Sequence, residues 1–302
     1  MIATIIVNYK SNKDTINFVN NELVKVKTPN IVIVVNNQAT TKSDNNFKKH
    51  LNAEIINDIS KPISNKKSCF IISEAKNIGF AKGNNLGSQF AKNHFKPDFL
   101  LFTNNDIQFI SDNVVEKLIS KIKCLNNAAI IGPRIIGTKG ENQSPEPFVS
   151  FMNRYFWVYW STPFLSKKSK KKLFNIEYSK NAAEGFHYKI MGSFFLAKTK
   201  DFFECGMMDP NTFLYAEEII LSERLKKINK RAYYFPDVSV LHFHSKTISS
   251  NISSKKKRMI KFTSESYYYT KYIGVSRITV ILVKMSFIFY NFLKNIKNNI
   301  VN

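Results

Sequence analysis

Short β-branched runs alternate with polar stretches of helical period through the first 130 residues or so. Continuous apolar strands joined by helices are typical of βαβ units in a parallel sheet that is buried on both faces. The pattern therefore predicts a doubly wound α/β half, with Ser111 or Asp112 as the cap of its last helix. The expected strands are Ile2–Val7, Ile31–Val35, Cys69–Ser73, Phe99–Thr103 and Ala128–Gly132, and the expected helices are Lys13–Val26, Gly83–Asn93 and Asp112–Lys123.

The periodicity fails over residues 137–184, where the chain is rich in proline, lysine and aromatic residues. Two interpretations of the aromatic run Tyr155–Trp160 stay open. The segment is either an insertion at one sheet edge that carries acceptor or membrane contacts, or it packs its aromatic residues in the core. Regular structure resumes with the apolar run Ile190–Ala197, a helix over Ala216–Ile228, and strands near Tyr233 and over Val238–Leu241.

An apolar helix is expected over about Ile278–Leu293, with Lys284 interrupting its apolar run. This stretch is shorter than the ~20 residues that a membrane-spanning helix needs. The helix is therefore expected to lie on a membrane surface or to pack on the protein. We divide the chain into an α/β domain, residues 1–245, and a C-terminal helical extension, residues 246–302.

The formal net charge is +23 and the isoelectric point is about 9.8. Such a charge favours an anionic partner, which can be nucleic acid, an anionic membrane or a phosphate-bearing substrate. A Lys-, Asn- and Ile-rich composition of the kind that an AT-rich genome produces would also account for part of it. Basic residues cluster over 167–172 and 255–258 beside apolar stretches, which favours a peripheral membrane protein.

The cysteines and the N-terminal residues indicate the compartment. Cys69, Cys124 and Cys205 are widely spaced and odd in number, so neither a disulfide framework nor a zinc cluster is expected. The run Met1–Val7 lacks the basic start of a signal peptide and is expected to be a strand. These features predict a cytoplasmic protein, and the basic clusters beside apolar stretches favour a peripheral position at the inner face of the plasma membrane.

Polar residues follow four of the expected strands, as Asn8-Tyr9, Asn36-Asn37, Glu74–Phe80 and Asn104–Asp106. In an open α/β sheet, ligands bind beyond the carboxyl ends of the strands. Asparagine and aspartate also form turns, so one such end alone would be weak evidence. Four successive ends favour a site where amides contact a nucleoside and a carboxylate holds a divalent cation against a diphosphate.

These segments resemble glycosyltransferase family 2, in particular its rhamnosyltransferase-like branch. The resemblance covers about residues 1–245 and implies a GT-A fold, with a mostly parallel central sheet flanked by helices. It implies a nucleotide-binding half, residues 1–135, an acceptor and catalytic half, residues 136–245, and a nucleoside-diphosphate sugar donor. The segments that carry it are Ile6–Tyr9, Val34–Asn37, Asn77–Asn85, Leu101–Asp106, Met191–Leu196, Gly206–Asp209, Phe213–Glu218 and Val240–His242.

The resemblance also implies roles for single residues. Asp106 corresponds to the last carboxylate of the family's Asp-x-Asp motif, which binds the Mg²⁺ or Mn²⁺ ion that bridges the donor diphosphate. His242 matches a histidine that ligates this metal or contacts the diphosphate, and His244 is close enough to exchange roles with it. Glu218 is expected to be the catalytic base of an inverting transfer, with Glu217 as the alternative. Two adjacent carboxylates also suit a helix N-terminus electrostatically.

Donor contacts are expected at the strand ends, with Asn104 in the first position of the metal motif. Asn36 stands where the family often has aspartate, and Asn105 stands where it often has proline or alanine. The change at position 36 could weaken base recognition or alter nucleotide choice, but an amide can still pair with the edge of uracil or thymine, so it does not exclude activity. The expected donor is a UDP- or dTDP-linked sugar. The expected donor-binding residues are Asn8, Tyr9, Asn36, Asn77, Gly79, Asn84, Asn104 and Asn105.

The expected activity is the extension of a cell-surface glycan, such as a capsule or lipopolysaccharide, on a glycan or lipid-linked acceptor. An inactive relative that serves as a binding or scaffold subunit is the alternative, because Asn36 replaces a carboxylate and Asp106 stands alone. A nucleic-acid-binding protein fits the charge, but the aromatic residues do not interleave with basic ones in a stacking motif. No nucleic-acid partner is therefore expected.

Overall fold

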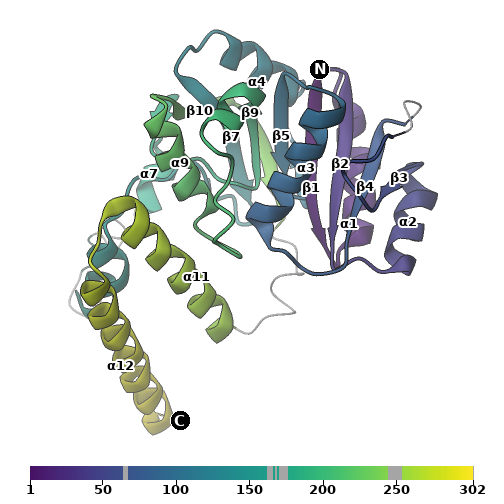
Figure 1. Cartoon of the computed structure of the whole chain (residues 1–302). Coiled ribbons are helices and arrows are strands. Elements are labelled where there is room, and N and C mark those ends of the chain that lie inside the picture. Colours follow the sequence, from purple (N-terminus) through teal and green to yellow (C-terminus); the bar gives the residue numbers. More distant parts are fainter. Residues whose placement is uncertain (64–66, 162–165, 167–168, 170–175, 244–253, 302) are drawn as a thin grey trace.

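The computed structural model describes the chain apart from residues 64–66, 162–165, 167–168, 170–175, 244–253 and 302. His244 therefore lies outside the described residues. One sheet forms the centre of the molecule, with helices on both of its faces, and two long helices project from one end (Figure 1).

The strand order in the sheet is β3-β4-β2-β1-β5-β9-β7-β10-β6, and β8 pairs with β10. The five strands from β3 to β5 are parallel, β9 runs antiparallel between β5 and β7, and β7 is parallel to β10. This mostly parallel sheet confirms the predicted α/β class. The strands are β1 Ile2–Tyr9, β2 Asn30–Asn37, β3 Glu54–Ile56, β4 Cys69–Glu74, β5 Phe99–Thr103, β6 Ile107–Phe109, β7 Ala128–Gly137, β8 Gly185–His187, β9 Phe194–Lys198 and β10 Arg231–His242.

Helices connect the strands and continue beyond the sheet to the C-terminal end. They are α1 Asn12–Asn21, the 3₁₀ turn η1 Leu23–Lys25, α2 Thr41–Leu51, α3 Phe80–His94, α4 Val114–Lys123, the π-helix η2 Asn153–Trp157, α5 Val158–Ser161, α7 Ile176–Lys180, α8 Thr199–Glu204, α9 Glu217–Lys227, α11 Ser254–Tyr268, the π-helix η4 Tyr269–Ile273 and α12 Arg277–Val301.

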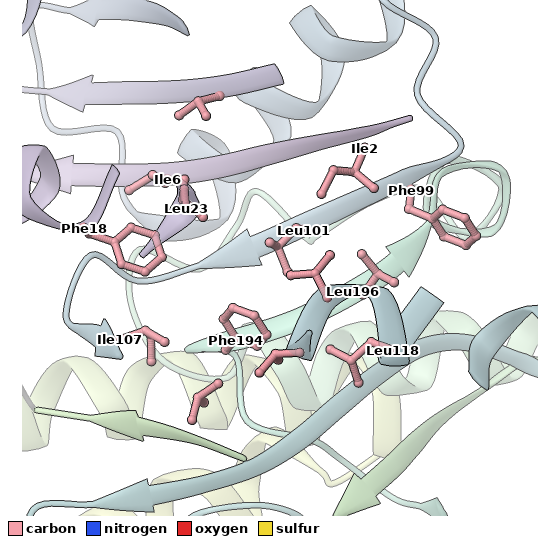
Figure 2. Close-up of a cluster of buried hydrophobic side chains, with 14 of the residues drawn as sticks. Ile2, Ile6, Phe18, Leu23, Phe99, Leu101, Ile107, Leu118, Phe194 and Leu196 are labelled. Carbon is pink, nitrogen blue, oxygen red and sulfur yellow. The ribbon is translucent and has the colours of Figure 1, made fainter. Parts of the chain in front are cut away.

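Successive strand residues point to opposite faces, so each face of the sheet buries its own apolar cluster. On one face, Ile6 and Leu101 pack with Phe18 of α1 and Leu118 of α4 (Figure 2). On the other face, Ile5 belongs to the cluster that α3, α8 and α9 cover. Burying one such side chain contributes about 1.5–3 kcal/mol to the stability of the fold. The polar strand ends lie outside these clusters, at the carboxyl edge of the sheet.

Two of the predicted helices begin or end elsewhere. The helix expected over Lys13–Val26 ends at Asn21, and a separate 3₁₀ turn follows. Ser111 and Asp112 do not cap α4; Asn113 lies at its N-cap in the left-handed conformation, without a side-chain capping bond. The Ser111 hydroxyl instead accepts a hydrogen bond from the backbone N–H of Ser239 in β10, at 2.9 Å.

Further elements differ from the sequence prediction. The two strands expected near Tyr233 and Val238 are one strand, β10, with an irregular register between Phe235 and Ser239. Helix α2 and strand β3 were not predicted, because α2 buries only Phe47 and Leu51 and has little apolar periodicity. Helix α12 spans Arg277–Val301 and is longer than the helix expected over about Ile278–Leu293.

The C-terminal helices share a third apolar cluster with α9 and the irregular segment before it. Phe151 and Tyr155 of the irregular segment lie in it, together with Ile220 of α9 and residues of α11 and α12. Tyr155 is thus a core residue, whereas Trp157 stays 50% exposed. The extension therefore packs on the first turns of α9, and its separation as a domain at residue 245 stays a prediction.

Candidate active site

Asp106 and His242 meet at one corner of the sheet edge. Asn104, Asn105 and Asp106 form the turn between β5 and β6. Strand β6 pairs antiparallel with the end of β10 and brings His242 opposite Ile107. His242 Nε2 lies 3.3 Å from Asp106 Oδ1, and both side chains are less than a tenth exposed. Two residues that are 136 positions apart in the chain are therefore adjacent in the fold.

Gln143 fixes the orientation of the histidine ring. Its Oε1 atom lies 2.9 Å from His242 Nδ1 and can only accept a hydrogen bond, so Nδ1 carries the proton and Nε2 points to Asp106. A carboxylate oxygen and an imidazole nitrogen side by side suit Mn²⁺, and they leave coordination positions for diphosphate oxygens and water. No group of three or more His, Cys, Asp and Glu side chains that could hold a metal occurs among the described residues.

The amide of Asn8 is engaged inside the protein. Its Nδ2 atom donates to Asn36 Oδ1 at 2.8 Å and to Asn12 Oδ1 at 2.9 Å, and its Oδ1 atom accepts from Ser11 and Thr15. The side chain is fully buried. Asn8 therefore holds the loop after β1 in place, and its contact with a donor stays a prediction.

Asn36 is hydrogen-bonded to Asp44, a carboxylate that was not predicted from the sequence. Its Nδ2 atom donates to Asp44 Oδ1 and to Ser43 Oγ, both at 2.8 Å, and Ser73 donates to Asp44 Oδ2 at 2.7 Å. Asp44 lies on α2, and because this helix was not predicted, Asp44 was not expected near the strand ends. Asp44 thus places a carboxylate one hydrogen bond away from Asn36.

Asn105 ties the turn that carries Asp106 to the same network. Its Nδ2 atom donates to Ser11 Oγ and to Thr15 Oγ1, both at 2.7 Å. Tyr9, at the end of β1, is partly exposed and lies under the Lys10 ammonium, which is 5.3 Å from the ring centroid. Of these residues, Tyr9 is the one that presents an aromatic face to solvent at the strand ends.

The block from Asn77 to Asn84 joins the two halves of the domain. Asn77 Oδ1 accepts from Gly79 N at 3.0 Å, and Asn84 Nδ2 donates to Phe80 O at 3.1 Å. Gly79 has a φ of +88°, and a Cβ atom there would lie 2.6 Å from Phe213 O. Only glycine fits this conformation and this close approach. The block thus packs against the loop that leads to the acidic pair.

The acidic pair begins α9 after two residues in a left-handed conformation, Tyr215 at φ 71° and Ala216 at φ 70°. Such backbone is costly and concentrates at functional sites. Glu217 is 3% exposed, and its Oε1 atom has no hydrogen-bond partner within the described part of the chain. Burial, and then the neighbouring Glu218 carboxylate, raise the pKa of Glu217 to about 8. Glu217 is therefore mostly protonated at pH 7.

Glu218 is partly exposed and is held by the backbone before β9. Its Oε1 atom accepts from Gly192 N at 3.1 Å. The next residue, Ser193, accepts from Asn104 N at 2.8 Å through its carbonyl oxygen. The two-residue segment Gly192–Ser193 therefore connects the Glu218 carboxylate with the turn that carries Asp106.

A buried ion pair supports this carboxylate. Lys189 Nζ lies 2.9 Å from Glu146 Oε1, and Lys189 is 7% exposed. Burial disfavours the ammonium, but the charges of Glu146 and Glu218 more than offset it and raise the pKa of Lys189. Lys189 therefore stays charged. Neither member of the pair stands out in the sequence.

Gly192→Ala should lower the turnover number on the order of 100-fold and leave the donor KM within about twofold, since a small displacement of a catalytic group has this cost. The new Cβ atom would lie 2.5 Å from Glu218 Oε1 and would push the carboxylate aside. Steady-state kinetics on the folded variant measure both constants. Ser120→Ala is the control, because this side chain is exposed on α4 and lies outside the site. An unchanged turnover number in Gly192→Ala would contradict the positioning of Glu218.

No protein-family model matches the chain, and no curated protein matches its sequence. Solved structures of similar fold include three glycosyltransferases. GalNAc-T7 with UDP, GalNAc and Mn²⁺ has a TM-score of 0.54 at 12% identity, over 81% of this chain and 44% of that one. The mannosyltransferase PcManGT from Pyrobaculum calidifontis, with GDP-Man and Mn²⁺, has a TM-score of 0.52 at 11% identity. The match covers 94% of this chain and 74% of that one. TarS 1–349 from S. aureus, with UDP-GlcNAc, has a TM-score of 0.50 at 15% identity. The match covers 96% of this chain and 72% of that one.

These likenesses confirm the GT-A type of fold that the sequence predicted. The chain spans less than half of GalNAc-T7, and the identities are low, so the likeness concerns the fold alone. Each of these solved structures contains a nucleotide or nucleotide sugar, and two contain Mn²⁺. The rhamnosyltransferase-like branch stays a prediction.

Proposed function

We propose that the protein is an inverting glycosyltransferase that moves a sugar from a nucleoside-diphosphate sugar to an acceptor hydroxyl. The observation that carries the proposal is the single connected edge where Asp106 and His242 adjoin and where Gly192–Ser193 links them to Glu218. In a mostly parallel α/β sheet this carboxyl edge is where ligands bind. The likeness to transferases of GT-A fold supports the proposal.

In the proposed reaction, Glu218 accepts the proton of the acceptor hydroxyl as that oxygen attacks the anomeric carbon from the face opposite the nucleotide. The configuration at that carbon is therefore inverted. Asp106 and His242 would hold Mg²⁺ or Mn²⁺, which neutralises the charge that builds on the leaving nucleoside diphosphate. Glycine at position 192 leaves room beside the carboxylate.

The donor is proposed to be UDP- or dTDP-linked, and the acceptor a glycan or lipid-linked glycan of the cell surface at the inner face of the plasma membrane. Both follow from the resemblance to glycosyltransferase family 2. A scaffold role without transfer is the competing function. It is distinguished by whether the protein releases nucleoside diphosphate from any sugar nucleotide.

Removal of the metal should abolish release of nucleoside diphosphate, and Mn²⁺ or Mg²⁺ should restore it. Asp106→Ala should lose this release at every metal concentration. Gln143→Ala should need about 10–100-fold more metal, because a residue that orients a ligating histidine tunes affinity by that factor. A panel of UDP-, dTDP- and GDP-sugars, titrated with metal after chelation, measures all three.

Asp112→Ala is the control, since this aspartate is exposed and lies outside the site. Equal activity with and without chelator would contradict the metal assignment. No release and no nucleotide binding by calorimetry across the panel would favour the scaffold role.

A further inference from the structure

Helix α12 exposes a stripe of large apolar side chains. Each member of the stripe is between 53% and 71% exposed. They recur at intervals of three and four positions, which places them on one side of a helix. The stripe consists of Ile278, Ile281, Leu282, Met285, Ile288 and Phe289.

The opposite side of α12 packs on the protein. Val283 is 3% exposed and Phe287 5% exposed, and the Phe287 ring stacks on Phe262 of α11 at 5.8 Å between centroids. Tyr155 lies edge-on to the same ring at 6.4 Å. Figure 1 shows α12 at the end of the molecule that is far from the sheet. The stripe therefore faces away from the protein, and packing within the described residues leaves it uncovered.

The charge beside the stripe has one sign. Glu265 is the last acidic residue of the chain, and five basic residues follow it. Arg277 and Lys284 are exposed on α12 next to the stripe. The indole of Trp160 stacks near Phe289 at 6.4 Å between centroids, and Trp157 is half exposed. Basic side chains and tryptophan around an apolar helix face are typical of the membrane–water interface.

We propose that the stripe on α12 docks on the surface of an anionic lipid bilayer, with the helix in the plane of the interface. A second copy of the chain fits the stripe less well, because a twofold contact would bring the basic flanks of both copies together. A spanning orientation would expose to lipid the side of α12 that packs on Phe262. Within the described residues, no helix is both long and apolar enough to cross a membrane.

This proposal deepens the location given under the proposed function but does not need the transfer reaction. Binding to vesicles is measured without donor or acceptor, and the metal-dependent release of nucleoside diphosphate is measured without vesicles. A failure of one therefore leaves the other standing.

Sedimentation with vesicles of phosphatidylglycerol and phosphatidylcholine tests the docking. The wild-type protein should bind them, and Leu282→Glu/Met285→Glu should lower the partition coefficient at least about tenfold, because two apolar side chains no longer enter the interface. Lys284→Gln should weaken binding about fivefold on these vesicles and leave binding to pure phosphatidylcholine unchanged. Val24→Glu is the matched control, since Val24 is 70% exposed but lies on η1.

Circular dichroism verifies that each variant is folded. Wild-type protein that stays in the supernatant at low salt would overturn the proposal, and so would a double variant that binds as tightly as wild type. A dimer in sedimentation velocity that the double variant abolishes, without vesicle binding by wild type, would instead assign the stripe to a second copy.

Discussion

Glu218→Gln should lower the turnover number of sugar transfer by about 10²–10⁴-fold and leave the affinity for the donor unchanged. The amide keeps the shape of the side chain and its place near Gly192 N, but it cannot accept the acceptor proton. The proposed donor and metal contacts lie at the strand ends and at Asp106 and His242, which this change does not touch. Single-turnover kinetics with the active donor measure the chemical step, and calorimetry measures donor binding.

Glu217→Gln is the matched control and should retain most of the activity at pH 7. Glu217 is buried and its raised pKa of about 8 keeps it protonated there, so a neutral amide of the same size replaces a group that is already neutral. The reverse result, with Glu217→Gln inactive and Glu218→Gln active, would assign the base to Glu217.

The same pair has a consequence for stability. A carboxyl group whose pKa is raised by folding stabilises the folded protein below its unfolded pKa of about 4.3, and this contribution falls as the pH rises toward the folded pKa. Wild type should therefore lose stability relative to Glu217→Gln as the pH rises from about 5 to 8. At the higher pH, the Glu217 carboxyl group therefore lowers the stability of the folded protein. It lies at the first turn of α9, next to the left-handed residues Tyr215 and Ala216.

The sheet and the polar strand ends could be predicted from the sequence, because a buried parallel strand is a continuous apolar run. Strands β1, β2, β4 and β5 agree with prediction, and the parallel register places Asn8 opposite Asn36 and Tyr9 opposite Asn37. Helix α9 agrees as well. Helix α2 was not predicted because its surface is polar nearly all round, and for the same reason Asp44 was not predicted to lie near the strand ends.

The groups that orient the site could not be predicted. Gln143 lies in a segment without periodicity, and only the fold of the chain back onto β7 and β10 brings its amide to His242. Lys189 and Glu146 meet through an isolated bridge between two irregular stretches. Contacts of this kind depend on side chains that are distant in sequence, and no local pattern encodes them.

The strand-end asparagines illustrate a different limit. Their positions were predicted, but residue type alone does not say whether an amide faces a ligand or the protein. Asn8 and Asn36 bind each other, and Asn105 binds Ser11 and Thr15, so these amides set the shape of the edge. The sequence resemblance located the edge, and the hydrogen bonds show how it is built.

Glu265→Gln should lower the free energy of unfolding by about 3–5 kcal/mol, the cost of leaving a buried charge without its partner. Glu265 is 2% exposed and binds Arg154 through two hydrogen bonds, at 2.5 and 2.9 Å, and Tyr155 OH at 2.7 Å. Burial disfavours the guanidinium, but Glu265 more than offsets it and raises the pKa of Arg154. Urea denaturation followed by circular dichroism measures the loss.

The double variant Arg154→Leu/Glu265→Leu separates the charge from the packing. It removes both charges, so it should be more stable than Glu265→Gln, because well-packed apolar residues often replace a buried ion pair without loss. If the free energy of unfolding of Glu265→Gln lies within about 1 kcal/mol of the wild-type value, the two cannot be distinguished by extrapolation from urea. That result would contradict the description of Arg154 and Glu265 as a buried ion pair. The effect should reach the active site, since α11 and η4 also bind Asp209, the buried residue before the acidic pair, through Tyr267 and Tyr272. The C-terminal helices therefore contact the loop that leads to Glu218 through residues of α11 and η4, while α12 carries the apolar stripe.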